Sequence, residues 1–334
     1  MPEKLFVVVL GAGPDQREIL RAVRRAGKKP VAFDKNPEAS EQGEATLFYP
    51  LSNRDPAPIL GTLKGLGITE EVAGVVAAGT EVPHVVATLQ NLLGLPGMSL
   101  AAAWALKDKR LYKRALRAAG VPCTREAKPG DKAAVVKPID GSGSRNVTVV
   151  ETGPFSGETL KVLCGGWPYT LVEAYQPGPQ ISSETLIWDG HGFTVAFADR
   201  HYDHANMTHP KELGVSMPSR WESERPKAHA VIMQAAAVLG ITRGTIKCDL
   251  VLTKQGPLII ECTSRLSGGP LAKLVREHSG IDYFKIVVEY ACGIKNRGTW
   301  MNAELKKVSL DMAGDENDYD DVGRWIPKEL PECV

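Results

Sequence analysis

The segment Val135-Val-Lys-Pro-Ile-Asp-Gly-Ser-Gly-Ser-Arg145 places a lysine at the end of an apolar strand, directly before a loop of small residues. A loop of this composition can fold over phosphate groups and donate backbone N–H groups to them. The ammonium group of Lys137 would add a point charge for the phosphate oxygens. Because the spacing G-x-x-x-x-G-K-[ST] is absent, the segment is not a Walker loop.

A second segment, Leu171-Val-Glu-Ala-Tyr-Gln-Pro-Gly178, reads as a strand that runs into a turn. Such a strand can present backbone groups to an adenine edge, with Glu173 accepting a hydrogen bond from the exocyclic amine. Lys109 lies near the start of a helix that we expect over residues 101–119. It would add a second positive charge to the same site.

A third region supplies two carboxylates. We expect strands over 245–252 and 258–262, joined as an antiparallel hairpin that sets Asp249 beside Glu261. Paired carboxylates aimed at a triphosphate are what Mg²⁺ with bridging phosphates requires. Each of these residues taken alone could be an ordinary surface residue. Their joint occurrence favours one site.

The composition excludes several classes of protein. The chain has 334 residues, 43% of them hydrophobic, and a formal net charge of +1. This charge gives no electrostatic reason to expect nucleic acid or an anionic membrane as a partner. The apolar run at residues 5–10 is shorter than a secretory signal or the ~18 residues of a membrane helix. The six cysteines have no zinc spacing. We expect a soluble, reduced, cytoplasmic protein of about two domains.

The first 98 residues read as repeated strand–helix units. Leu5-Phe-Val-Val-Val-Leu10 is typical of a strand buried on both faces of a parallel sheet, and the pattern predicts a doubly wound α/β domain over 1–98. Gly11-Ala-Gly13 follows this strand and is half of a dinucleotide fingerprint, with Asp34 as the ribose-binding acid. Gln16 stands where the third glycine would be, so NAD binding, a small-substrate contact and a purely structural turn stay open.

The character of the chain changes after residue 98. Short strands with hairpin signals follow the long helix, and Asp189-Gly190 predicts a two-residue turn between the strands at 181–188 and 193–198. Helices are expected over residues 228–239, 270–278 and 283–292. These elements predict α+β units over 99–175 and 176–334.

Together the segments resemble the ATP-grasp superfamily of carboxylate–amine ligases, over residues 5–292. The most specific parts are Val136-Lys-Pro with its small-residue loop and Ile260-Glu-x-x-x-Arg-Leu-Ser-Gly-Gly269. The resemblance implies a Rossmann-like domain over 1–98, a small lid subdomain over 99–175 and a C-terminal subdomain over 176–334 with the magnesium and substrate sites.

The resemblance also implies roles for individual residues. Asp249 and Glu261 would bind Mg²⁺, while Arg265 and Lys137 would be catalytic and stabilise the transferred phosphate and the acyl intermediate. The residues implied for ATP are Lys109, Lys137, Gly141, Ser142, Gly143, Ser144, Glu173, Ala174, Tyr175 and Gln180.

Two positions depart from the family pattern. Gln180 stands where a ribose-binding Glu is usual, with Glu184 as an alternative partner for the ribose. Thr263 stands where an Asn metal ligand is usual, which leaves the second metal site open.

The substrate-binding residues are less well defined. The segment Asp199-Arg-His-Tyr-Asp-His-Ala-Asn-Met-Thr-His209 has three histidines without the spacing of a zinc helix, so a substrate contact and a surface loop are both open. The candidate substrate contacts are Arg200, His201, His209, Arg220, Gly268 and Gly269.

The hypothesis that follows is a ligase that uses ATP and Mg²⁺. It would activate a small carboxylate, such as an amino acid, as an acyl phosphate and join it to an amine, with release of ADP and phosphate. Three alternatives stay open: an enzyme that uses bicarbonate, a nucleotide-binding module without turnover, and an NAD(P)-dependent oxidoreductase. The expected partners are small molecules and, from the fold family, a second copy of the chain.

Overall fold

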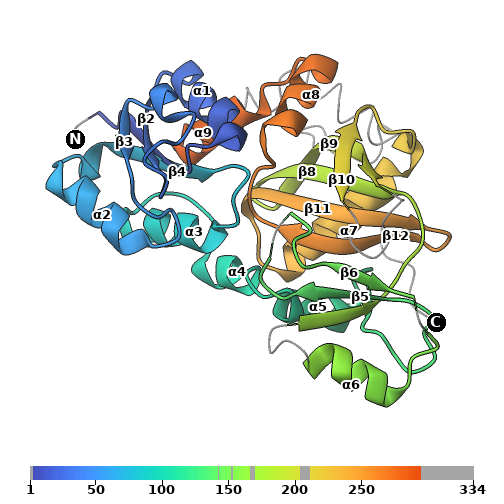
Figure 1. Ribbon diagram of the computed structural model, residues 1–334. Helices are drawn as coiled ribbons and strands as arrows, with labels where there is room; N and C mark the ends of the chain where they lie inside the picture. Colours follow the sequence, from blue (N-terminus) through green and yellow to red (C-terminus); the bar gives the residue numbers. More distant parts are fainter. Residues whose placement is uncertain (1–2, 142, 152, 166–169, 204–210, 295–334) are drawn as a thin grey trace.

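The structure, a computed structural model, describes residues 3–141, 143–151, 153–165, 170–203 and 211–294. Within these ranges the chain forms a parallel sheet and two antiparallel sheets, each packed against helices (Figure 1). Short 3-10 turns are η1 (Pro14–Gln16), η2 (Gln42–Glu44), η3 (Thr69–Glu71) and η4 (Glu222–Glu224).

The N-terminal unit is built on a four-stranded parallel sheet in the order β3-β2-β1-β4. Its strands are β1 (Phe6–Leu10), β2 (Lys29–Phe33), β3 (Leu47–Tyr49) and β4 (Val72–Ala77). Strand β1 is apolar throughout because both faces of the sheet are covered. On one face Val8 and Leu10 pack with α2 (Pro56–Gly65) and α3 (Pro83–Leu92), and on the other face Val7 and Val9 join a second core.

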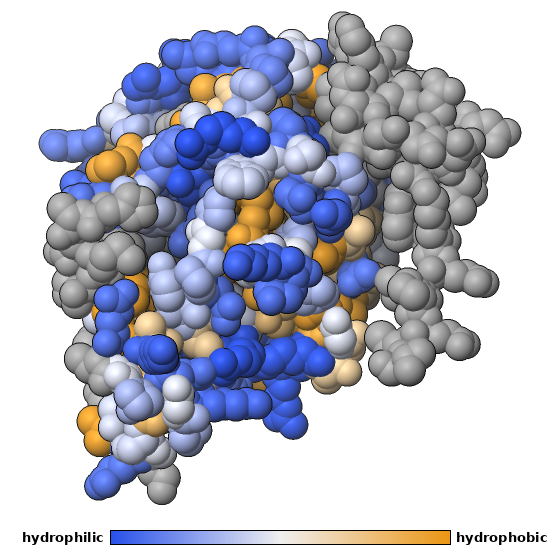
Figure 2. Space-filling view, turned by 90° about the vertical axis from the view of Figure 1, so that its right-hand side faces the viewer, coloured by the Kyte–Doolittle hydropathy of each residue, from blue (hydrophilic) through white to orange (hydrophobic). Residues whose placement is uncertain are grey.

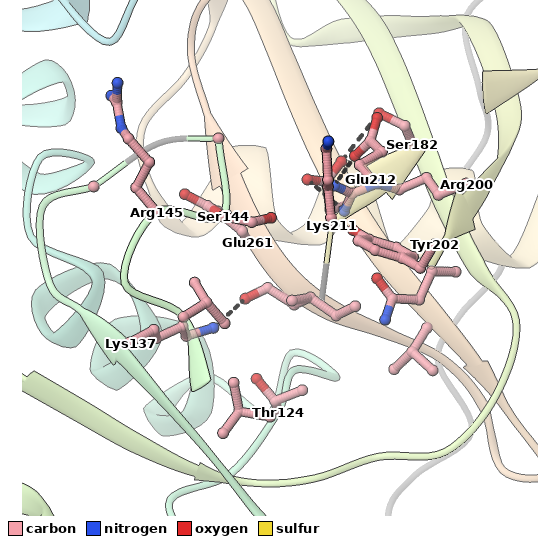
Figure 3. Close-up of a pocket in the computed structure, with 18 of the residues that line it drawn as sticks. Thr124, Lys137, Ser144, Arg145, Ser182, Arg200, Tyr202, Lys211, Glu212 and Glu261 are labelled. Atoms are coloured by element: carbon pink, nitrogen blue, oxygen red, sulfur yellow. Dashed lines mark hydrogen bonds and ion pairs between the residues drawn. The ribbon is translucent and has the colours of Figure 1, made fainter. Parts of the chain in front are cut away.

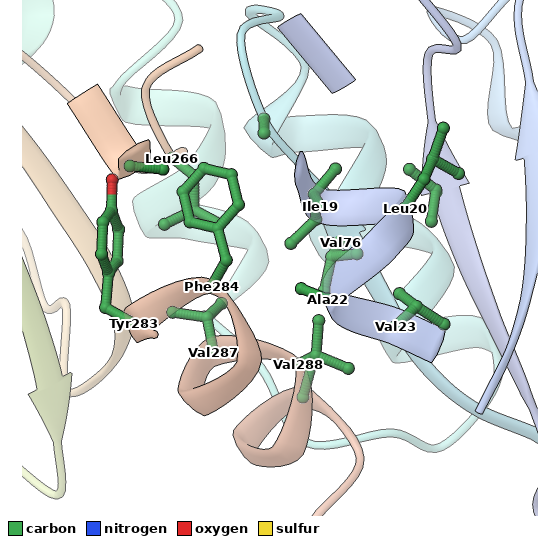
Figure 4. Packing of buried hydrophobic residues seen from close by; sticks show 14 of the residues in the cluster. Ile19, Leu20, Ala22, Val23, Val76, Leu266, Tyr283, Phe284, Val287 and Val288 are labelled. Carbon is green, nitrogen blue, oxygen red and sulfur yellow. The ribbon is translucent and has the colours of Figure 1, made fainter. Parts of the chain in front are cut away.

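That second core contains residues from the far end of the described chain. Helices α8 (Gly269–Ser279) and α9 (Tyr283–Ala291) pack with α1 (Arg17–Arg25) and with β4 (Figure 4). The contact is so close that a Cβ atom on Gly74 would lie 2.9 Å from the backbone of Ala291. We expected α8 and α9 to be part of the unit over 176–334. They do contact the large antiparallel sheet of that unit, and their apolar faces also complete the core of the N-terminal sheet.

Phe284 tests this packing. Its side chain is 1% exposed and its ring meets that of Tyr283 edge-on at 4.8 Å. Phe284→Ala is expected to lower the free energy of unfolding by about 3–5 kcal/mol, because it removes a large buried side chain and leaves a cavity. Urea denaturation measures this change. The control Val162→Ala, at a position 68% exposed, should change it by less than about 0.5 kcal/mol, and an equal effect of both substitutions would contradict the packing.

The largest sheet is antiparallel, in the order β10-β9-β8-β11-β12. Its strands are β8 (Gln180–Trp188), β9 (His191–Tyr202), β10 (Glu212–Ser216), β11 (Arg243–Thr253) and β12 (Gly256–Thr263), with α7 (Arg225–Val238) packed on it. The predicted turn between β8 and β9 is confirmed: Asp189 and Gly190 have φ of 48° and 83°, as a tight hairpin turn requires. The predicted pairing of Asp249 with Glu261 is also confirmed.

The third sheet, β6-β5-β7, is small and antiparallel. It contains β5 (Ala134–Pro138), β6 (Thr148–Val150) and β7 (Thr170–Ala174), with α6 (Gly157–Gly165) packed against β7. The helix that we expected over 101–119 is instead two helices, α4 (Leu100–Ala105) and α5 (Lys109–Ala118). The chain breaks there because the Asp108 carboxylate caps α5, accepting from the backbone N–H of Arg110 at 2.8 Å. Lys109 is therefore the first residue of α5.

One face of the molecule is shown in Figure 2, coloured by hydropathy. The face in Figure 2 is mainly hydrophilic, with hydrophobic residues visible between hydrophilic ones near its centre. Of the helices described here, none has the length and apolar character that crossing a membrane requires.

Candidate active site

A cavity of about 1870 Å³ is lined by residues of the two antiparallel sheets and of loops that include the one after β4. The N-terminal unit contributes Asp15, Gly79 and Glu81, and most of the remaining wall comes from the two antiparallel sheets and their loops, with Lys109 of α5 and Leu271 of α8. Figure 3 shows Lys137 on one side of this cavity and Arg200 on the other, with Glu261 between them. The topology thus brings separate stretches of sequence to one place.

The two predicted phosphate-binding lysines both line this cavity. Lys109 forms an ion pair with Glu261 (Nζ–Oε1 3.0 Å) and donates to the carbonyl of Gly141 at 2.8 Å. Lys137 is the next-to-last residue of β5, forms an ion pair with Glu173 (Nζ–Oε2 2.5 Å) and donates to the carbonyl of Ile260. Both ammonium groups are therefore fixed at the cavity wall.

Glu173 is almost completely buried and joins three partners. Its Oε1 accepts from Lys113 at 2.6 Å and from the hydroxyl of Thr124 at 2.9 Å, while Oε2 pairs with Lys137. Burial opposes ionisation, but the charges of Lys137 and Lys113 hold the pKa of Glu173 below its ordinary value. The carboxylate is thus occupied by two cations, which differs from the expected role as an acceptor for the adenine amine.

Asp249 and Glu261 are neighbours on β11 and β12 and both line the cavity. Asp249 pairs with Lys247 at 2.5 Å and with Arg200 at 2.9 Å, and accepts from the Ser182 hydroxyl at 3.0 Å. Although burial opposes it, the charges of Arg200 and Lys247 hold the pKa of Asp249 well below its usual range. The carboxylate stays ionised.

This donor set fits a hard divalent cation, because carboxylate oxygens are the ligands that Mg²⁺ prefers. Among the residues that the structure describes, no group of three or more His, Cys, Asp or Glu side chains could hold a metal. A cation held by Asp249 and Glu261 would therefore complete its coordination with phosphate and water oxygens.

Glu81, from the loop after β4, reaches across to the end of β12. Its Oε2 accepts from the Thr263 hydroxyl at 2.8 Å, and its Oε1 accepts from Arg265 Nε at 2.5 Å. Burial lowers the pKa of Arg265, but the charge of Glu81 outweighs it and keeps the guanidinium protonated. Thr263 stands where the family pattern has an Asn metal ligand, and its hydroxyl donates to Glu81. No role was predicted for Glu81 from the sequence, although its place after a buried strand was a signal.

Comparison with known proteins identifies the domain that holds this site. The family model described as "ATP-grasp domain" matches residues 106–269. The chain carries an ATP-grasp domain. It is 25% identical to the uncharacterised protein y4rH of Sinorhizobium fredii over 355 residues, which cover 96% of this chain and 71% of that protein.

Two solved structures show the same fold. Phosphoribosylglycinamide synthetase from Anaerococcus prevotii has a TM-score of 0.70 at 18% identity, over 86% of this chain and 75% of that one. L-amino acid ligase from Bacillus licheniformis has a TM-score of 0.68 at 19% identity, over 87% of this chain and 75% of that one.

The predicted lid of the ATP-grasp domain lies over the same cavity. Gly141, Gly143 and Ser144 line it, and Ser142 lies outside the described residues. Gly143 and Ser144 have φ of 65° and 54°, a left-handed conformation that is unusual for serine. The loop therefore turns tightly above Lys137.

The expected adenine-binding strand is β7. Ala174 and Tyr175 line the cavity, but their backbone N–H groups already donate, to the carbonyls of Arg125 at 3.0 Å and Ala133 at 3.1 Å. Gln176 and Gly178, which the sequence analysis did not single out, line the same wall. The adenine contact from this strand stays a prediction.

Gln180 and Glu184 occupy different surroundings. Gln180 lines the cavity, whereas Glu184 lies about 13 Å further along β8 and is 1% exposed. The Glu184 carboxylate accepts from the backbone N–H of Ser267, and burial raises its pKa. It holds the loop after β12, so its alternative role as a ribose partner is not supported.

The predicted substrate-binding residues differ in their surroundings. Arg200 is paired with Asp249 and Glu212, so it is not free to hold a substrate carboxylate, contrary to our expectation. His201 lines the cavity with its ring on the Ser216 hydroxyl at 2.8 Å, and His209 lies outside the described residues. Gly268 lines the cavity and Gly269 begins α8.

Arg220 is the strongest of these candidates. Its side chain is 77% exposed and lines the cavity, with Nε donating to Asp199 at 2.9 Å. Burial opposes ionisation of Asp199, but the Ser219 hydroxyl and Arg220 hold the pKa of its carboxyl below the ordinary value. The terminal nitrogens of Arg220 have no partner among the described residues, so they are available to a carboxylate.

Proposed function

We propose that this chain is an ATP-dependent ligase that activates a small carboxylate as an acyl phosphate and joins it to an amine. The observation that carries the proposal is that Lys109, Lys137, Asp249 and Glu261 all face one cavity in an ATP-grasp domain. In this proposal the N-terminal parallel sheet is the Rossmann-like unit that precedes the domain. The free thiols among the described cysteines agree with a cytoplasmic setting, and a homodimer stays a proposal.

In the first step, a substrate carboxylate oxygen attacks the γ-phosphorus of ATP, and the bond to the β–γ bridging oxygen breaks. The products are an acyl phosphate and ADP. Lys109 and Lys137 would hold the phosphates, and Asp249 with Glu261 would hold Mg²⁺, which neutralises charge on the transferred group. Arg265 would hold the acceptor side, where its guanidinium can bind two oxygens at once.

In the second step, the amine attacks the acyl carbon, phosphate leaves and the nitrogen loses a proton, which yields an amide. Water must be excluded, because it hydrolyses an acyl phosphate. Gly141, Gly143 and Ser144 line the cavity beside the small sheet, which supports a role of this region as the lid.

The proposal is tested by product analysis with a panel of carboxylates and amines. ADP and phosphate should form only when carboxylate, amine and Mg²⁺ are all present. Release of AMP would contradict the acyl phosphate. Turnover with bicarbonate in place of the carboxylate would support the carboxylase alternative, and ATP binding without turnover would support a nucleotide-binding module.

Arg220 provides a test of the carboxylate end. Arg220→Ala should raise the KM for the carboxylate by about tenfold to a hundredfold, since hydrogen bonds to a charged group are lost, and leave the KM for ATP unchanged. Initial rates at varied carboxylate measure this. Arg243→Ala, at an exposed Arg–Asp pair with Asp189, is the matched control. An equal rise in the KM for the carboxylate and the KM for ATP would contradict a specific contact between Arg220 and the carboxylate.

A further inference from the structure

Lys113 is a buried cation that the proposed chemistry does not use. It lies one helical turn after Lys109 on α5, and its side chain is 0% exposed. Its ammonium group contacts the Glu173 carboxylate at 2.6 Å and the Thr124 hydroxyl. Because it does not line the cavity, it would touch no nucleotide.

The charges around Glu173 show what this lysine can do. Glu173 stands between Lys113 on Oε1 and Lys137 on Oε2, at 2.6 Å and 2.5 Å. With both lysines charged, the three groups carry a net charge of +1. Without the charge of Lys113, Glu173 would be balanced by Lys137 alone, and the pair would present no net charge to a phosphate.

We propose that Lys113 is a positioning residue of the nucleotide site, which balances the charge of Glu173 and leaves the ammonium group of Lys137 to bind phosphate. This inference rests on the proposed function, because it needs a nucleotide in the cavity. Lys113 acts through Glu173 and Lys137, without contacting the ligand itself.

The surroundings of Lys113 should make nucleotide affinity depend on pH. The ionisable groups that face it are Glu173 from β7, Lys137 from β5 and the Cys123 thiol beside Thr124. Burial, followed by the charge of Lys137, lowers the pKa of Lys113 to about 8. The charges of Glu173 and Glu261 outweigh burial and raise the pKa of Lys137, and burial raises that of Cys123. Lys113 therefore loses its proton first, and nucleotide affinity should fall as the pH rises through about 8.

The experiment measures the Kd of the Mg²⁺ complex of a non-hydrolysable ATP analogue by calorimetry. Lys113→Met should raise this Kd about tenfold, because Glu173 then competes with phosphate for Lys137. The double variant Lys113→Met with Glu173→Gln removes both charges and should restore the Kd to within about threefold of wild type. Arg114→Met removes one charge from the exposed side of the same helix and should leave the Kd unchanged.

Each outcome decides the question. Failure of the wild-type protein to bind the analogue would overturn the proposed function. If the wild-type protein binds the analogue and the Kd values of Lys113→Met and Arg114→Met are equal, the role of Lys113 is overturned while the proposed function stands. If Lys113→Met and the double variant bind the analogue equally weakly, and circular dichroism shows that both are folded, the role of Lys113 is structural and the inference is overturned. If Lys113→Met does not fold, the wild-type Kd between pH 7 and pH 9 still tests the inference, and a flat profile would contradict it.

Discussion

Glu261→Gln is expected to reduce ADP formation on the order of 10³-fold, the scale found when a group that stabilises transition-state charge is removed. The substitution keeps the shape of the side chain but removes the negative charge that would hold Mg²⁺ and that pairs with Lys109. Because Asp249 already shares its charge with Arg200 and Lys247, it cannot replace Glu261. A coupled assay of ADP release measures the loss.

Glu277→Gln is the matched control for this variant. Glu277 is an exposed carboxylate on α8, paired only loosely with Lys273 at 3.6 Å. Its loss should leave turnover unchanged. If Glu261→Gln forms ADP as fast as the wild-type protein at subsaturating Mg²⁺, the proposed binding of Mg²⁺ by Asp249 and Glu261 is contradicted.

Arg265→Lys is expected to reduce kcat on the order of 10²-fold while the Kd for the nucleotide stays within about twofold. Lysine keeps the positive charge but loses the planar guanidinium, which can bind Glu81 and a transferred phosphoryl group at the same time. The pair with Glu81 fixes Nε, and the carbonyl of Leu266 accepts from one terminal nitrogen. Stopped-flow and steady-state rates together separate binding from turnover.

The control here is Arg21→Lys, which changes an exposed arginine paired with Glu44 at 2.7 Å. It should leave both kcat and the nucleotide Kd unchanged. If Arg265→Lys weakened nucleotide binding as much as it slowed turnover, Arg265 would be a nucleotide contact and not a group of the acceptor side.

The parts of the fold that depend on local patterns could be predicted from the sequence. The turn at Asp189-Gly190 follows from two residues that tolerate positive φ. The pairing of Asp249 with Glu261 follows from the length of the hairpin between two apolar strands. Lys109 begins α5 and Lys137 lies near the end of β5, and both reach one cavity; motif spacing can reveal such positions.

Other features depend on contacts between distant residues, which no local pattern encodes. Glu173 has the spacing of an adenine-binding residue, but its role in the structure is set by Lys113, sixty residues away. Glu184 shares a strand with Gln180, yet the loop at Ser267 decides its surroundings. The apolar faces of α8 and α9 are visible in the sequence, whereas their partner, the N-terminal sheet, is not.

The return of α8 and α9 to the first sheet decides how the protein can be dissected. The core of the N-terminal unit is discontinuous in sequence, because Phe284 and other apolar residues of α8 and α9 shield α1 and β4. A recombinant fragment that stops at residue 98 lacks these residues. Such a fragment would expose that surface and aggregate. An excised ATP-grasp segment that keeps both helices would carry the complementary bare surface, so the two pieces should be soluble only when produced together.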